Sequence, residues 1–167
     1  MTNIIIDTKK HDCTCQKEHC VCQKIIITYN KKLSCYTYPC IIELMIGTKI
    51  AGRAKLSTID QYDEINVKER TLIDLKKTMK LSHIYVDEKY RGQNFSRILL
   101  CNILEVAKIR FSAEWIILYC IPLYRDDAKW LKQYYEKLGF VDIGFKNLMY
   151  ANINLILPNI LRETPNF

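Results

Sequence analysis

Residues 81–96 read LSHIYVDEKYRGQNFS, and this stretch decides the fold. Its first half alternates apolar and polar side chains, which is typical of a β-strand. Its second half passes Arg91 and Gly92 and enters a long helical pattern at Phe95. The first N–H groups of a helix are unpaired and its dipole is positive there, so a helix that follows a strand and a small-residue turn binds anions. Lys89 and Arg97 add formal charge, and we therefore expect a phosphate or pyrophosphate site at this turn.

Two blocks of the sequence carry a family resemblance. Val86 is followed, after four residues, by RGQNFS at 91–96. This block resembles the acyl-CoA loop of the GNAT superfamily of N-acyltransferases, which usually reads Arg/Gln-x-x-Gly-x-Gly/Ala. Further along, YYEKLGF at 134–140 is similar to the closing helix of that family, which ends aromatic-Tyr-x-x-x-Gly-Phe. The resemblance covers roughly residues 40–155. It implies an α/β (α+β) fold with a mixed, mostly antiparallel central sheet and two main helices.

The resemblance also implies a reaction and its site. The expected function is N-acetyltransfer from acetyl-CoA to a primary amine, by direct attack in a ternary complex. Tyr135 matches the family's general acid, and a phenol with a reference pKa of about 10 can protonate a departing thiolate. Tyr135 can also be read as a core aromatic. The residues expected to bind acetyl-CoA are Ile84, Val86, Arg91, Gly92, Gln93, Asn94, Phe95 and Ser96.

Three positions depart from the family pattern. Asn94 stands where the family prefers Gly, and Ser96 where it prefers Gly or Ala. Asn tolerates a positive φ best after Gly, and Ser can cap a helix or bind an anion, so we interpret both as tolerated variants. Ala128 stands where many members have an Asn that holds the pantetheine arm. These departures leave an alternative open, namely a non-catalytic GNAT-like module that binds CoA or a metal and acts in regulation or interaction.

The general base is left open by the sequence. Strand alternation places His83 on the face opposite Ser82 and Ile84, which predicts a structural histidine unless a β-bulge inverts the parity. Glu43, Glu114 and a water relay are the other candidates.

Composition limits the class of protein. The chain has 167 residues, 49% hydrophobic and 26% charged, which fits one globular domain with a buried core. The net charge of +7 suits an anionic cofactor. No basic run is long enough for a nucleic-acid arm, so nucleic acid is not an expected partner. The glycine signatures of dinucleotide-binding and P-loop proteins are also missing from the sequence.

Two observations concern the compartment. The apolar residues 4–6 are too few for the core of a signal peptide. The longest apolar run, 115–124, is too short to span a membrane. We therefore expect a cytoplasmic (intracellular) protein with no membrane partner.

The first 23 residues hold a second chemical signal. Two Cys-x-Cys pairs are separated by four residues, and His11 and His19 lie among them. Thiolates in such an arrangement can bind Zn²⁺ or Cu(I). The alternatives are a polar tail with incidental cysteines, or a redox role. The candidate metal ligands are Cys13, Cys15, Cys20 and Cys22.

The remaining pattern divides the chain into a tail at 1–23, the acetyltransferase domain at 24–157 and a C-terminal tail at 158–167. Strands are expected at 24–30, 33–38, 41–46, 50–57, 115–123, 140–145 and 149–157, and helices at 95–111 and from 126 to Gly139. The gap before residue 41 has no helical period. We therefore predict that the helices that commonly follow the family's first strand are missing and that the acceptor, in an open groove, is a polypeptide. Residues 60–80 fit either a short helix or an extended arm beside the acceptor site.

Overall fold

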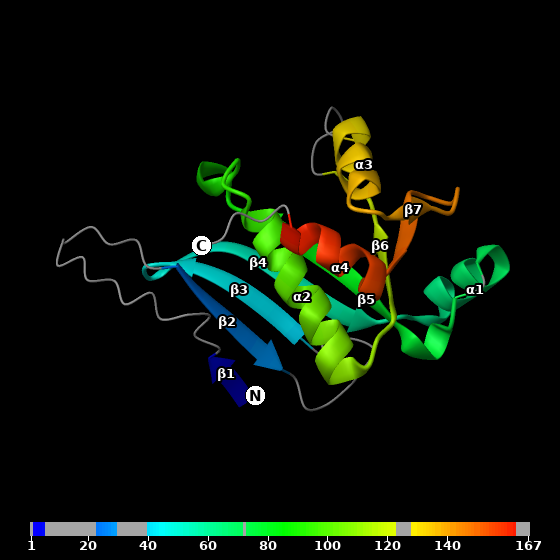
Figure 1. The fold of residues 1–167 in the computed structure, drawn as a ribbon, viewed down its shortest axis with the longest axis horizontal. Coiled ribbons are helices and arrows are strands. Elements are labelled where there is room, and N and C mark those ends of the chain that lie inside the picture. Colours follow the sequence, from blue (N-terminus) through cyan, green and yellow to red (C-terminus); the bar gives the residue numbers. More distant parts are fainter. Residues whose placement is uncertain (1, 6–22, 30–39, 72, 123–127, 163–167) are drawn as a thin grey trace.

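A computed structural model describes residues 2–5, 23–29, 40–71, 73–122 and 128–162 (Figure 1). In this part of the chain the strands are β1 (Thr2–Ile5), β2 (Gln23–Tyr29), β3 (Cys40–Ile46), β4 (Lys49–Thr58), β5 (Thr78–Val86), β6 (Trp115–Tyr119), β7 (Val141–Asp142) and β8 (Leu148–Asn152). The helices are α1 (Gln61–Arg70), α2 (Phe95–Phe111), α3 (Ala128–Lys137) and α4 (Ile153–Arg162), with short 3₁₀ turns at Leu75–Lys77 and Glu88–Tyr90.

The strands form one mixed sheet in the order β1-β2-β3-β4-β5-β6-β8-β7. Every neighbouring pair is antiparallel except β5 and β6, which are parallel. The mixed, mostly antiparallel sheet predicted from the sequence is thus confirmed. Ten residues separate β2 from β3, fewer than two helices of average length need. Those residues, 30–39, lie outside the described part, so the missing helices and the strand at 33–38 stay predictions.

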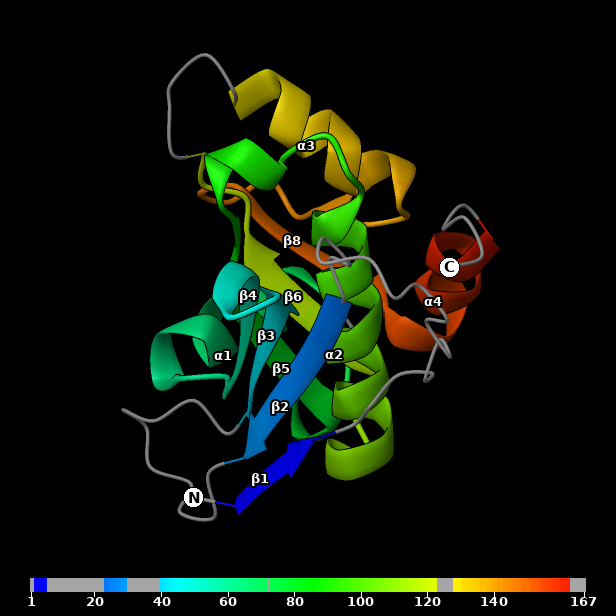
Figure 2. The same ribbon diagram turned by 90° about the vertical axis from the view of Figure 1, so that its left-hand side faces the viewer.

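The sheet carries helices on both faces. Figure 2 shows α1 on one side of the strands and α2 with α4 on the other. The α2 face holds the larger core, in which Leu99, Ile103 and Ile116 are fully buried. A smaller core under α1 joins Val67 to Ile117 and Leu148. Neighbouring residues of β6 alternate between the two cores because successive strand side chains point to opposite faces.

Helix α2 begins and ends where the apolar stripe predicted. Helix α3 is described from Ala128, and its Gly139 has φ of +99°, as expected for a residue that stops a helix. Residues 60–80, whose sequence fits either a short helix or an extended arm, contain the helix α1. Its first turn has a capping box in which the Asp60 side chain accepts from the Asp63 N–H and the Asp63 side chain from the Asp60 N–H.

The C-terminal prediction was wrong in part. The strand expected over 149–157 ends at Asn152, and α4 continues from Ile153 through Pro158. Ile153, Ile156, Leu157 and Ile160 are buried, and their helical spacing packs them against the larger core. This face explains why residues that were expected to form the end of a strand and the start of a C-terminal tail form a helix instead.

Two smaller expectations also need correction. Strand β6 ends at Tyr119, short of the predicted residue 123. Gly144 falls within the strand expected at 140–145, but it lies in the turn between β7 and β8 with φ of +73°. Its N–H donates to the Asp142 carboxylate at 2.7 Å, which is the hydrogen bond of an Asx turn.

Gly52 on β4 is required by close packing. A Cβ at this position would lie 2.8 Å from Leu99 Cδ1 on α2 and 2.8 Å from the Tyr85 carbonyl oxygen on β5. We expect Gly52→Ala to lower the free energy of unfolding by about 2 kcal/mol, because the backbone of a paired strand cannot move aside. Chemical denaturation measures the change. Gly47→Ala, at an open turn position, tests the cost of a positive φ alone. A change below about 0.5 kcal/mol for Gly52→Ala would show that the two strands separate easily.

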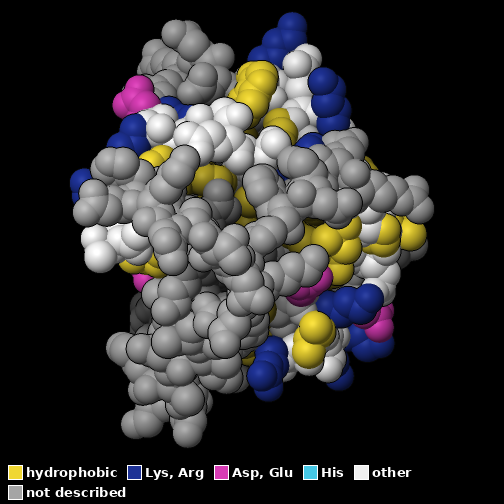
Figure 3. Space-filling model, turned by 60° about the vertical axis from the view of Figure 1, so that its left-hand side comes forward, with side chains coloured by type: hydrophobic (Ala, Val, Ile, Leu, Met, Phe, Trp, Pro, Cys, Tyr) yellow, Lys and Arg dark blue, Asp and Glu magenta, His cyan; other side chains and the backbone are white. Residues whose placement is uncertain are grey.

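Two features bear on possible partners of the protein: the distribution of basic side chains on the surface and the length of the helices. On the face shown in Figure 3, the Lys and Arg side chains of the described residues lie at several separate places around the outline. Their spread fits a solvated basic surface. Within the described ranges, no helix is both long and apolar enough to cross a membrane.

Candidate active site

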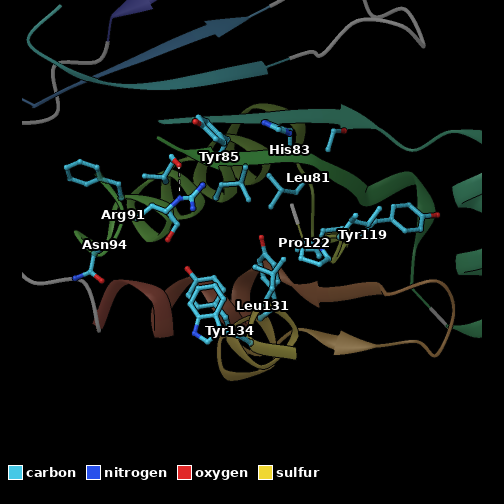
Figure 4. A pocket seen from close by; sticks show the side chains of 18 of the residues that line it. Leu81, His83, Tyr85, Arg91, Asn94, Tyr119, Pro122, Leu131 and Tyr134 are labelled. Atoms are coloured by element: carbon cyan, nitrogen blue, oxygen red, sulfur yellow. Dashed lines mark hydrogen bonds between the residues drawn. The ribbon is translucent and has the colours of Figure 1, made fainter. Parts of the chain in front are cut away.

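The cavity lies where β5 and β6 diverge. These strands pair only between Thr78–Lys80 and Trp115–Ile117. Beyond that point the sheet opens into a cavity of about 860 Å³. It is lined by residues of β5, the loop before α2, the end of β6 and α3. Figure 4 shows Leu131 and Tyr134 of α3 across the cavity from β5.

The open edge of β5 offers backbone hydrogen-bonding groups to this cavity. The Asp87 N–H donates to the Ala51 carbonyl at 2.9 Å and so points toward β4. Because antiparallel pairing alternates, the N–H and C=O groups of Val86 and Ile84 point away from β4, toward the side from which β6 has diverged. Arg91 Nε donates to the Val86 carbonyl from this side at 3.3 Å. Both predicted backbone sites therefore face the opening.

The loop after β5 delivers the N-terminus of α2 to the same cavity. Gly92 has φ of +77° and Asn94 φ of +59°, so Asn accepts the left-handed conformation for which the family uses Gly. Asn94 makes no side-chain cap, while the N–H groups of Arg97 and Ile98 donate to its carbonyl. The uncapped first turn leaves the positive end of the helix open to an anion.

The structure brings together all of the predicted cofactor-binding residues except one. Ile84, Val86, Arg91, Gly92, Asn94, Phe95 and Ser96 line the cavity. Gln93 is exposed and is not part of the lining. Phe95 is 2% exposed and anchors the loop in the larger core, where its ring contacts Tyr90. This anchor fixes the start of α2 beside the cavity.

The surroundings of Tyr135 fit both interpretations that the sequence left open, a core aromatic and a general acid. Its side chain is 4% exposed, with ring edges packed against Tyr134 and Phe140 at centroid distances of 5.3 Å. It nevertheless lines the cavity. Burial, followed by the neighbouring Tyr134 and Cys120, raises the pKa of the Tyr135 phenol above its ordinary value. The phenol is therefore protonated at neutral pH and holds a proton to donate.

A β-bulge at Ser82 changes the facing of β5. Lys55 pairs with His83 and Leu56 with Leu81, so Ser82 is the extra residue. His83 is exposed, stacks on Tyr85 at a centroid distance of 6.3 Å and is among the residues that line the cavity. In Figure 4 both rings lie on the side of β5 opposite Leu81. The sequence allowed for such a bulge without locating it.

The candidate bases differ in their surroundings. Burial, then Lys55 and Arg53, lower the pKa of His83, so its imidazole is neutral near pH 7. The Glu43 carboxylate is ion-paired with Arg53 on the neighbouring strand. Glu114 is bonded to Lys77 at 2.5 Å. Neither glutamate belongs to the cavity lining.

Helix α1 contributes a buried carboxylate that the sequence analysis missed. Asp63 is 0% exposed and binds Lys80 Nζ at 2.8 and 3.1 Å. The Tyr119 hydroxyl donates to the same carboxylate at 3.0 Å. Lys80 and Tyr119 line the cavity. Burial and the Asp63 hydrogen bond raise the pKa of Tyr119. The acidic capping pattern at residues 60–63 was the available signal for this helix.

A second contact fixes α1 to the turn between β7 and β8. Lys146 Nζ donates to the Tyr62 hydroxyl at 2.9 Å, and it lies 5.4 Å from the ring centroids of both Tyr62 and Phe145. Helix α1 is therefore fixed both to β5 and β6 beside the cavity and to the β7–β8 turn.

No group of His, Cys, Asp and Glu able to hold a metal ion occurs within the residues that the structure describes. The predicted ligands Cys13, Cys15, Cys20 and Cys22, with His11 and His19, lie outside those residues. Metal binding by the N-terminal segment therefore stays a prediction.

The diverging parallel strands, the open β5 edge and the uncapped helix define the architecture of an acyl-CoA-dependent acyltransferase. The sequence matches the acetyltransferase (GNAT) family over residues 12–140, and the protein belongs to this family. Among curated proteins, none matches the sequence.

Solved structures share the fold at low sequence identity. A structure described as a bacterial toxin is 18% identical, with a TM-score of 0.55 over 77% of this chain and 74% of its own. A protein of Staphylococcus aureus Mu50 that is assigned as an acetyltransferase is 16% identical, with a TM-score of 0.53 over 68% of this chain and 71% of its own. AtaTR bound with AcCoA is 14% identical, with a TM-score of 0.50 over 70% and 69%. These similarities establish the fold.

Proposed function

We propose that this protein is an acetyl-CoA-dependent N-acetyltransferase. The observation that carries the proposal is the cavity between β5 and β6, which combines an open strand edge with the uncapped N-terminus of α2. The strand edge suits the amides of a pantetheine arm, and the helix N-terminus with Arg91 suits a pyrophosphate. AtaTR, which shares the fold, is bound to AcCoA in its structure.

The chemistry follows from these positions. The neutral amine of the acceptor attacks the thioester carbonyl carbon, and the carbon–sulfur bond breaks. Backbone groups at the open edge near Ile84 and Val86 polarise the carbonyl oxygen. The Tyr135 phenol protonates the departing thiolate. The proton of the amine passes to His83 or to a water relay, and the neutral imidazole expected for His83 near pH 7 suits this role.

The acceptor is a primary amine, and we extend the proposal to an amine of a polypeptide. The short connection between β2 and β3 supports an open groove, whereas α1 supports a partial wall at one end. Comparing kcat/KM for a panel of lysine-containing peptides with kcat/KM for polyamines decides between these geometries. A preference of more than about tenfold for the small amines would mean that α1 closes the site.

Arg91→Glu tests the cofactor loop. We expect it to weaken acetyl-CoA binding by well over tenfold, because a charge-assisted phosphate contact is replaced by repulsion. Calorimetric titration measures the dissociation constant. Lys108→Glu makes the same charge change at an exposed position in the last turn of α2, away from the cavity. Equal affinity in both variants would remove the Arg91–Ser96 loop from the binding site.

A further inference from the structure

The hydroxyl of Tyr134 is the feature that the proposed mechanism does not use. Its oxygen atom is buried and has no hydrogen-bond partner among the described residues. Leaving a buried hydroxyl unsatisfied destabilises the folded protein. A phenylalanine would fill the same space without that cost. The hydroxyl therefore points to a partner outside the described residues, and a bound ligand can supply one.

Neighbouring rings fix the direction of this hydroxyl. The Tyr134 ring stacks on Trp130 at a centroid distance of 5.7 Å and an interplanar angle of 14°. On another side it meets the Tyr135 ring at 5.3 Å and 67°. Both contacts come from α3, so the ring is held before any ligand arrives. A group that is oriented in advance gives up little entropy when it forms its hydrogen bond.

The position of Tyr134 identifies the part of the ligand that it faces. Figure 4 shows Tyr134 projecting from α3 toward β5, between Arg91 and Asn94 at one end of the view and Pro122 toward the other. In the proposed function the phosphates of the acyl-CoA bind at the Arg91 end of the cavity, and its sulfur atom lies near Tyr135. The segment of acyl-CoA between the phosphates and the sulfur is the pantetheine arm, which contains two amide groups. An amide carbonyl is an acceptor of the kind that a phenol O–H requires.

We propose that the Tyr134 hydroxyl donates a hydrogen bond to an amide carbonyl of the pantetheine arm of the acyl-CoA. This inference rests on the proposed function. The hydroxyl supplies a polar contact to the arm in a chain whose residue 128 is Ala, with no side-chain amide of its own. The exposed Trp130, stacked on the same ring, supports the tyrosine at the cavity wall.

The test compares two ligands that differ by the arm. CoA carries it, and adenosine 3′,5′-bisphosphate carries the nucleotide and one of the bridging phosphates without it. We expect Tyr134→Phe to weaken CoA binding by about tenfold, the loss of one buried hydrogen bond, and to leave binding of the bisphosphate unchanged. The melting temperature of the free variant should stay equal or rise, since the hydroxyl has no described protein partner. Tyr150→Phe is the matched control, a half-buried tyrosine packed on Trp115 outside the cavity lining.

Every other result would contradict either the hydrogen bond from Tyr134 or the proposed cofactor site. Equal CoA affinity in Tyr134→Phe and the parent would overturn the hydrogen bond. An equal loss for both ligands would place the hydroxyl on the nucleotide, and a lowered melting temperature would make it structural; both overturn the inference. A parent protein that binds neither ligand would contradict the proposed cofactor site itself.

Discussion

Tyr135→Phe is expected to lower kcat by about 10²–10⁴, the range typical of general acid catalysis, while acetyl-CoA affinity stays within a few-fold. The substitution keeps the ring, so its edge contacts with Tyr134 and Phe140 and the packing of α3 are preserved. Only the proton donor for the departing thiolate is removed. Single-turnover kinetics with the parent protein, Tyr135→Phe and the control Tyr150→Phe measure the effect.

The pH profile separates a chemical role from a packing role. The raised pKa of Tyr135 keeps the phenol protonated throughout the range in which the protein is assayed, so its removal should lower kcat at every pH without moving the acidic limb. That limb should follow the group that accepts the proton of the amine. An unchanged kcat in Tyr135→Phe would make this residue a core aromatic and leave water as the acid.

Lys80→Met is expected to lower the free energy of unfolding by about 3 kcal/mol, because breaking a buried ion pair leaves the remaining charge buried without its partner. The Asp63 side chain is 0% exposed and would keep only its bonds to the Tyr119 hydroxyl and the Asp60 N–H. We place the value at the low end of the usual range because the Lys80 side chain is 19% exposed and partly solvated. Urea denaturation of the parent and the variant measures the difference.

A double variant makes this prediction specific. Lys80→Met combined with Asp63→Leu removes both charges, and we expect it to recover part of the loss, since replacing both partners of a buried pair by apolar groups is often close to neutral. A loss below about 1 kcal/mol in Lys80→Met, or a double variant less stable than the sum of both single changes, would show that the pair does not hold α1 to the sheet.

The parts of the fold that the sequence predicted have strong local signals. Helix α2 runs from Phe95 to Phe111 as expected, because its apolar stripe is regular and Gly92 and Asn94 terminate the preceding loop. The β3–β4 hairpin follows from alternation around Gly47, which has φ of +59°. The cofactor loop was visible because strand, small-residue turn and helix follow one another within sixteen residues.

The parts that the sequence did not predict depend on tertiary contacts. Residues 153–157 are apolar enough for a strand, and only packing against α2 and the core makes them the start of α4. The bulge at Ser82 depends on pairing with β4, which no local pattern of β5 reports. Asp63 would be expected at the surface by its type, and it is buried because Lys80 and Tyr119 bind it. The buried hydroxyl of Tyr134 is likewise a property of the folded cavity.

The cavity between β5 and β6 is the proposed binding site of acetyl-CoA. Calorimetric titration of the full chain with acetyl-CoA, repeated in the presence of saturating free CoA, tests it most directly. We predict saturable binding of one acetyl-CoA per chain, which free CoA abolishes and which Arg91→Glu weakens while Lys108→Glu does not. Absence of binding to the folded parent protein, or binding that free CoA leaves unchanged, would contradict the account.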